Sequence, residues 1–154
     1  MRAFVAMPFH SDMNWVYDII KTSCLRNSVR CVRVDDIGGV DNIWSAIKDE
    51  IEKSDFLICD FSCDPCFKGR QLSASMMRNS ANSNVVTEAG YAMALEKPII
   101  LLTNNVNSLP FDWKTFLAIV YKPSEKEILQ KTLDKQIIHR FDKVKFVYSC
   151  LRYS

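Results

Sequence analysis

The chain alternates short apolar runs with amphipathic segments, and this alternation constrains the fold more than any other feature. Apolar runs bounded by turn residues are typical of strands buried on both faces, and apolar residues at helical spacing predict helices. Strands are expected at residues 2–7, 29–34, 55–61, 97–103 and 116–122. Helices are expected at residues 12–26, 43–53, 84–95 and from 124 towards 150.

This order predicts an α/β fold, in which a parallel sheet is covered by helices on both faces. Five strands favour a three-layer, doubly wound, flavodoxin-like sheet with the strand order 2-1-3-4-5. A length of 154 residues suits one domain spanning residues 1–154. Residues 62–83 are polar and lack any firm periodicity, so we expect an inserted loop or lid there.

Composition narrows the class of protein. A net charge of +2 is nearly balanced, which argues against a nucleic-acid partner. No segment is apolar enough over a sufficient length to span a membrane, and the apolar run at the start is too short for a signal peptide. We therefore expect a cytoplasmic protein.

The six cysteines include one C-x-x-C pair, Cys63 and Cys66. A zinc site needs two further ligands, and neither histidine stands beside a second cysteine pair. We interpret the pair as two loop thiols, and we expect no metal and no cofactor.

The first three predicted strands end in segments that carry polar and aromatic residues: "MPFH", "DD" and "CDFS". In such sheets ligands bind beyond the carboxyl ends of the strands, at the switch point between strands 1 and 3. The usual phosphate-binding motifs, GxxxxGK and GxGxxG, are absent. The residues expected at this edge are Met7, Pro8, Phe9, Asp35, Asp60, Asn84 and Glu88.

Glu88 is the most informative of these residues. A carboxylate near the start of a helix is favoured by the helix dipole, and Asn84 is a good N-cap, so an ordinary structural role is one interpretation. However, Val85, Glu88, Ala89 and Ala92 share one helix face, which turns Glu88 towards the core rather than towards water. A catalytic carboxylate is the alternative.

Three segments, "FVAMPF", "IWSAIKDEIEKSDFLICDFS" and "NVVTEAGYAMALEKPIILLT", resemble the nucleoside 2-deoxyribosyltransferase-like superfamily, which is related in architecture to TIR-like domains. The resemblance covers residues 1–121 apart from the insertion. It implies cleavage or transfer of a glycosyl group at the N-glycosidic bond of a nucleoside or nucleotide, with Glu88 as the nucleophile that attacks the anomeric carbon. A carboxylate beneath the sugar ring suits an oxocarbenium-like transition state.

The other candidates each allow two interpretations. Asp60 is either a second acid that helps the base to leave or a cap for the amides of its own loop. Asp35 either binds a sugar hydroxyl or forms a turn. Phe9 and Tyr91 either stack on the base or pack in the core. Lys68, Arg70 and Arg78 either reach a phosphate or lie on a solvated loop surface.

The chain also departs from the family pattern. Characterised members carry an acid late on the second helix, where this chain has Ile47. Their active sites are often completed by a neighbouring subunit, which makes a homo-oligomer an expected partner arrangement. Two alternative functions therefore stay open: a TIR-like NAD glycohydrolase, and a non-catalytic sensor that binds a nucleotide.

Overall fold

The computed structural model describes residues 1–36, 42–62 and 81–151, with side chains described as far as residue 140. The strands are β1 (Arg2–Ala6), β2 (Arg30–Arg33), β3 (Phe56–Asp60), β4 (Ile99–Thr103) and β5 (Ala118–Val120). The helices are α1 (Asn14–Arg26), α2 (Ile43–Lys53), α3 (Ser83–Ala94) and α4 (Lys126–Leu151). Short 3-10 helices are η1 (Ser11–Met13), η2 (Val34–Asp36), η4 (Val106–Ser108) and η5 (Phe111–Thr115).

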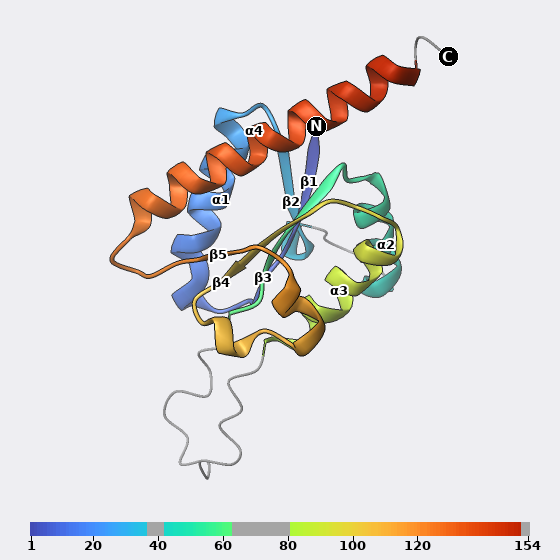
Figure 1. Cartoon of the computed structure of the whole chain (residues 1–154). Helices are drawn as coiled ribbons and strands as arrows, with labels where there is room; N and C mark the ends of the chain where they lie inside the picture. The colour runs from blue at the N-terminus through green and yellow to red at the C-terminus, as the bar shows by residue number, and fades with distance from the viewer. Residues whose placement is uncertain (37–41, 63–80, 152–154) are drawn as a thin grey trace, which may run out of the picture.

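The five strands form one parallel sheet in the order β2-β1-β3-β4-β5, which confirms the predicted topology (Figure 1). β1 lies inside the sheet, where Ala3 is paired with Cys31 of β2 on one side and with Phe56 of β3 on the other. All five residues of β3 are buried, as expected for a central strand covered on both faces.

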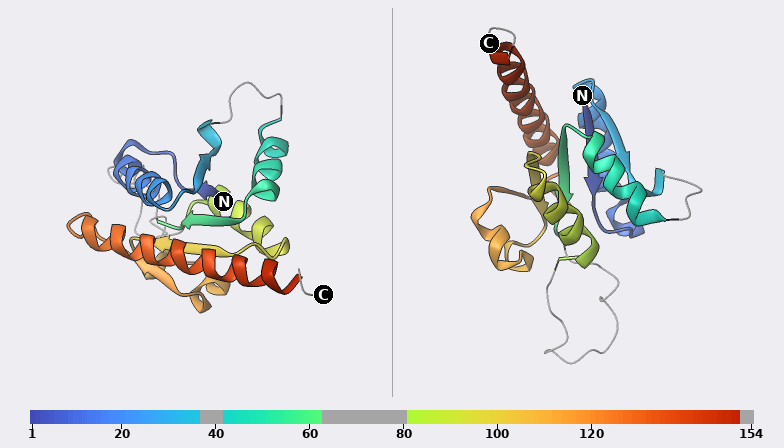
Figure 2. Two further views of the ribbon diagram at one scale, coloured as in Figure 1. Left: turned by 90° about the horizontal axis from the view of Figure 1, so that it is seen from above. Right: turned by 90° about the vertical axis from the view of Figure 1, so that its right-hand side faces the viewer.

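Helices cover both faces of the sheet and make three layers (Figure 2). α1 and α4 pack on one face against alternate strand residues such as Val5 and Ile58. α2 and α3 pack on the other face against the intervening residues, including Phe4 and Leu57. The helices that flank the candidate site, α2 and α3, therefore share one face and begin at the same edge of the sheet.

The start of α3 differs from the prediction. The helix begins at Ser83, and its N-cap is Asn82, whose side chain accepts a hydrogen bond from the backbone N–H of Asn84 at 2.9 Å. Asn84 is thus a residue of the first turn and not the cap. Both positions carry the same cap-forming amide, so composition alone did not separate them.

Two other boundaries were also predicted wrongly. α1 begins at Asn14, because the preceding residues form η1, with His10 as its N-cap. β5 is short, because η5 occupies the residues before it and Phe116 caps that 3-10 helix. Residues 63–80 of the predicted insertion lie outside the described part of the chain. They include Cys63, Cys66 and the basic residues Lys68, Arg70 and Arg78.

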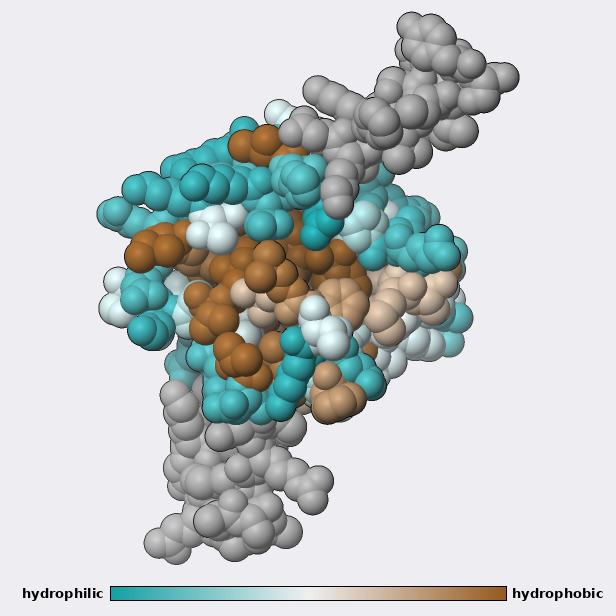
Figure 3. All heavy atoms as spheres, viewed as in Figure 1, coloured by the Kyte–Doolittle hydropathy of each residue, from teal (hydrophilic) through white to brown (hydrophobic). Residues whose placement is uncertain are grey.

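Apolar side chains also gather on the outer face around β5 and the neighbouring 3-10 helices (Figure 3). Phe111 and Leu117 are the most exposed of them, at 86% and 88%. Within the described ranges, no helix combines the length and the apolar character needed to cross a bilayer.

Candidate active site

A cavity of about 630 Å³ opens beyond the carboxyl ends of β1 and β2, between the first turns of α2 and α3. This is the carboxyl edge of the sheet, where the topology predicts the ligand site. Its lining is mostly apolar with a few polar groups, which is typical of small-molecule sites. The described residues that line it are Phe9, Val34, Asp35, Ile43, Trp44, Ile47, Asn84, Thr87 and Glu88.

Glu88 projects from the second turn of α3 into this cavity. Its neighbours on the same helix face, Val85, Ala89 and Ala92, are buried against the sheet, and Glu88 is itself only 6% exposed. The inward orientation predicted from the sequence is therefore confirmed. No side chain in the described ranges donates a hydrogen bond to this carboxyl, so cavity contents are free to do so.

Burial raises the pKa of Glu88 from its ordinary value of 4.5 to about 7. We expected the helix N-terminus to favour the ionised form, but the dipole effect fades beyond the first turn and Glu88 is the sixth residue of α3. Desolvation by the apolar wall therefore dominates. Both protonation states of the carboxyl are therefore accessible near neutral pH.

Arg33, at the end of β2, does not line the cavity but contacts two residues of one of its walls, Asp35 and Phe9. Its Nε donates a hydrogen bond of 2.6 Å to Asp35, and Nη2 binds the second carboxylate oxygen, so the ion pair is bidentate. The guanidinium carbon lies 3.8 Å from the ring centroid of Tyr17 and 5.3 Å from that of Phe9. Arg33 thereby fixes two lining residues, Phe9 and Asp35, and its hydrogen bonds, aided by its charge, lower the pKa of Asp35.

The opposite wall belongs to α2 and is apolar. Ile43 and Trp44 are 62% and 40% exposed at the mouth of the cavity, and Ile47 is buried deeper. The resemblance led us to expect an acid at the position of Ile47. The described lining therefore has two carboxylates, Asp35 and Glu88, and only Glu88 lacks a described partner.

Asp60 does not line the described cavity. It is fully buried, accepts a 2.9 Å hydrogen bond from the backbone N–H of Ser62, and accepts a 2.8 Å hydrogen bond from the hydroxyl of Tyr121. Burial raises its pKa, although these two hydrogen bonds oppose the rise. The contacts agree with the alternative interpretation, in which Asp60 caps its own loop; a part in catalysis stays a prediction.

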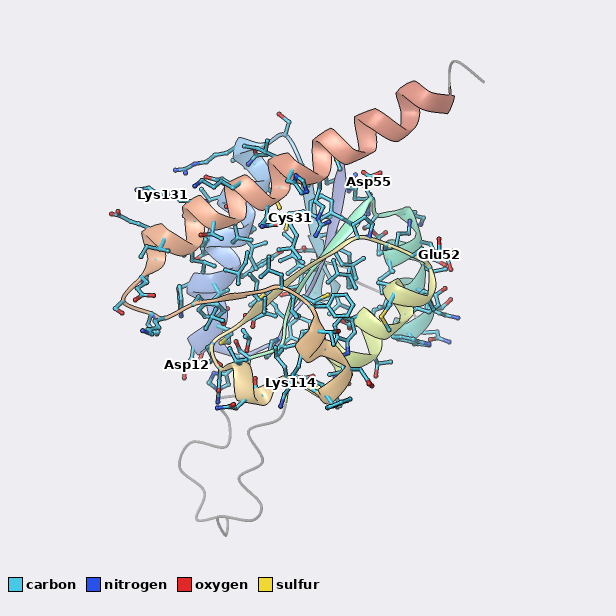
Figure 4. All side chains as sticks on the ribbon, viewed as in Figure 1. Asp12, Cys31, Glu52, Asp55, Lys114 and Lys131 are labelled. Carbon is cyan, nitrogen blue, oxygen red and sulfur yellow. The ribbon has the colours of Figure 1, made fainter. Side chains whose placement is uncertain are left out.

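Three predicted binding residues also lie outside the described lining. Met7 and Pro8 are buried, and the sulfur of Met7 faces the guanidinium of Arg33 at 3.7 Å. Tyr91 donates a 2.5 Å hydrogen bond to Glu52 on the outer side of α2 and α3, where Figure 4 labels Glu52. The ring of Tyr91 meets that of Trp44 edge-on at 6.1 Å, so it supports a lining residue instead of forming the cavity.

Sequence reasoning missed Arg33, Trp44 and Thr87. Arg33 stands beside two aspartates, and this charge pattern was a signal that could have been used. Trp44 is an apolar residue of α2, and the neighbouring sequence does not distinguish a side chain at the mouth of a cavity from one in the core. Thr87 precedes Glu88 on the exposed side of a helix and carries no signal of its own.

No protein-family model matches the chain, and no curated protein matches it by sequence. Its structure is similar to that of a 2-deoxyribosyltransferase from Leishmania mexicana, with 22% identity and a TM-score of 0.52 over 68% of this chain and 65% of that one. It is also similar to a Clostridium botulinum CMP N-glycosidase, with 17% identity and a TM-score of 0.59 over 88% and 99% of the two chains.

A third similar structure is a prokaryotic SEFIR domain, with 15% identity and a TM-score of 0.55 over 87% of this chain and 90% of that one. At these identities the likeness defines the fold. The chain has a nucleoside 2-deoxyribosyltransferase-like fold, related to TIR-like domains.

Proposed function

We propose that this protein cleaves or transfers the glycosyl group at the N-glycosidic bond of a nucleoside or nucleotide, with Glu88 as the nucleophile. The observation that carries the proposal is the placement of Glu88. It is a carboxyl that is 6% exposed, faces a mostly apolar cavity and binds no described donor. Buried carboxyls with perturbed pKa values in a cleft are typical of catalytic sites.

The chemistry follows from that placement. The ionised carboxylate attacks the anomeric carbon, a C–O bond to Glu88 forms, and the C–N bond breaks with its electron pair leaving on the base. The base is neutralised by a proton from solvent or from a second acid. Water, or the nitrogen of another base, then attacks the same carbon and releases Glu88 as a carboxylate.

The apolar walls suit an aromatic base. Phe9 and Trp44 present exposed rings at the cavity, and such rings bind flat aromatic ligands by stacking. Asp35 and Asn84 offer oxygen and amide groups that can bind sugar hydroxyls. Both residues line the cavity.

The test compares the wild type with Glu88→Gln, which keeps the size of the side chain and removes its charge. Release of free base is followed from deoxynucleosides and their 5′-monophosphates, and release of nicotinamide from NAD. We expect the variant to lose on the order of a hundredfold or more in kcat/KM, while binding is retained. Glu127→Gln, an exposed position on α4, is the matched control. Equal rates for the wild type and Glu88→Gln would exclude this mechanism.

A non-catalytic nucleotide sensor is the second candidate, and Ile47 favours it. This side chain lines the cavity where the resemblance implies an acid, so one polar contact to the sugar is replaced by an apolar surface. Binding of a nucleoside or nucleotide without release of any base would support the sensor over the enzyme.

A further inference from the structure

The charges around the cavity are arranged unevenly. Asp35 and Glu88 both line it, and the other described lining residues are uncharged. The basic group nearest to Asp35 in the described structure is Arg33, which does not line the cavity and whose side chain is 11% exposed. Asp35 therefore lines the cavity as one half of an ion pair, and the cation of that pair lies outside the described lining.

Arg33 is held firmly in that position. Its backbone N–H donates a 2.9 Å hydrogen bond to Asp36, and the hydroxyl of Tyr17 donates one of 3.1 Å to the same carboxylate oxygen. The ring of Tyr17 lies against the guanidinium. Because Arg33 is fixed by these contacts, Asp35 is in turn fixed at the cavity wall by the bidentate pair.

A guanidinium binds a phosphate with the same two-pronged geometry that it uses for a carboxylate. Asp35 therefore occupies the position at Arg33 that a substrate phosphate would otherwise take. A phosphate that enters the cavity gains no described cation, because Asp35 already occupies and neutralises Arg33, and the two carboxyls of the lining disfavour a further anion.

We propose that Asp35 is a specificity-determining residue that selects uncharged N-glycosides, such as nucleosides, against their 5′-phosphates. Arg33 acts as its positioning residue. The inference rests on the proposed function, because it assigns the substrate class of the same cavity. It also disfavours dinucleotides such as NAD, which carry two phosphates.

The test measures equilibrium binding of the four common 2′-deoxynucleosides and their 5′-monophosphates by calorimetry. The proteins are the wild type, Asp35→Asn and Asp35→Glu, with Asp112→Asn as a control for the same change of charge at an exposed site on η5. Asparagine keeps the shape of the side chain but cannot neutralise Arg33, so it releases a cation towards the cavity. Glutamate keeps the charge.

We expect the wild type to bind at least one nucleoside about tenfold or more tightly than its monophosphate. Asp35→Asn should shift this ratio towards the monophosphate by about tenfold or more, while Asp35→Glu and Asp112→Asn should retain the preference of the wild type. A general loss of structure would weaken both ligands together and leave the ratio unchanged, so the ratio isolates specificity from folding.

A wild type that prefers monophosphates, or a ratio in Asp35→Asn that stays within about threefold of the wild type, would overturn the inference. The proposed function fails separately. A shifted binding ratio with no base release by the wild type refutes the enzymatic function alone, and base release with an unshifted ratio refutes the selection alone. No binding of either ligand class refutes both.

Discussion

Replacing Glu88 by glutamine should stabilise the folded protein, and the gain should grow as the pH rises. The folded pKa of Glu88 is raised from 4.5 to about 7, so between these values the folded state binds a proton that the unfolded state has released. Its contribution to the free energy of unfolding therefore falls through this window and stays low above it. Each tenfold change in acidity is worth about 1.4 kcal/mol, so the loss approaches about 3 kcal/mol by pH 8.

Urea denaturation of the wild type and Glu88→Gln at pH 5, 6, 7 and 8 measures this effect. The buried amide of glutamine adds a contribution of about 1 kcal/mol that does not depend on pH. The informative quantity is therefore how the free energy of unfolding of Glu88→Gln, minus that of the wild type, changes with pH. Glu127→Gln, which removes an exposed carboxylate on α4, should show no comparable trend. A difference between wild type and Glu88→Gln that is the same at every pH would refute the claim that burial destabilises the charge.

Two further predictions concern pH and the end of β3. If Glu88 must be ionised to attack, kcat/KM on an accepted substrate should rise with pH through an apparent pKa near 7; a flat profile from pH 5 to 8 would contradict this. Tyr121→Phe should lower the free energy of unfolding by about 1–3 kcal/mol, because the phenol donates to buried Asp60 and also contacts the hydroxyl of Ser62. Tyr91→Phe, which removes an exposed phenol, should cost less in the same denaturation experiment, and an equal cost would refute the importance of the buried network.

The fold was predictable because its signals are local and strong. Strands buried on both faces need continuous apolar runs, and helices that cover them need one apolar stripe, so both leave clear periods in the sequence. The boundary of α3 was not predictable, since Asn82 and Asn84 offer the same capping chemistry two residues apart. Which one becomes the cap depends on how the chain leaves the loop, and that is a tertiary effect.

The site was predictable only in part. The rule that ligands bind beyond the carboxyl ends of the strands correctly placed Phe9, Asp35 and Glu88 together, because the carboxyl ends of parallel strands share one edge of the sheet. It did not separate them from Asp60, the last residue of β3, whose side chain lies in a buried hydrogen-bond network. Position at a strand end gives the edge of the sheet, whereas the alternation along β3 turns Asp60 to the face of Ile58, which α1 and α4 cover, and away from the face of α2 and α3.

Ile47 stands where the resemblance implies an acid, and this apolar side chain bears directly on how Glu88 can work. A second carboxylate beside Glu88 would raise its pKa further by repulsion, but would also bind a sugar hydroxyl. With Ile47 in the wall, burial is the cause of the raised pKa, and Asp35 is already paired with Arg33. The proposed nucleophile is then a single carboxyl with a pKa of about 7. Because no second described carboxyl is available to protonate the departing base, substrates whose bases leave without prior protonation should react fastest.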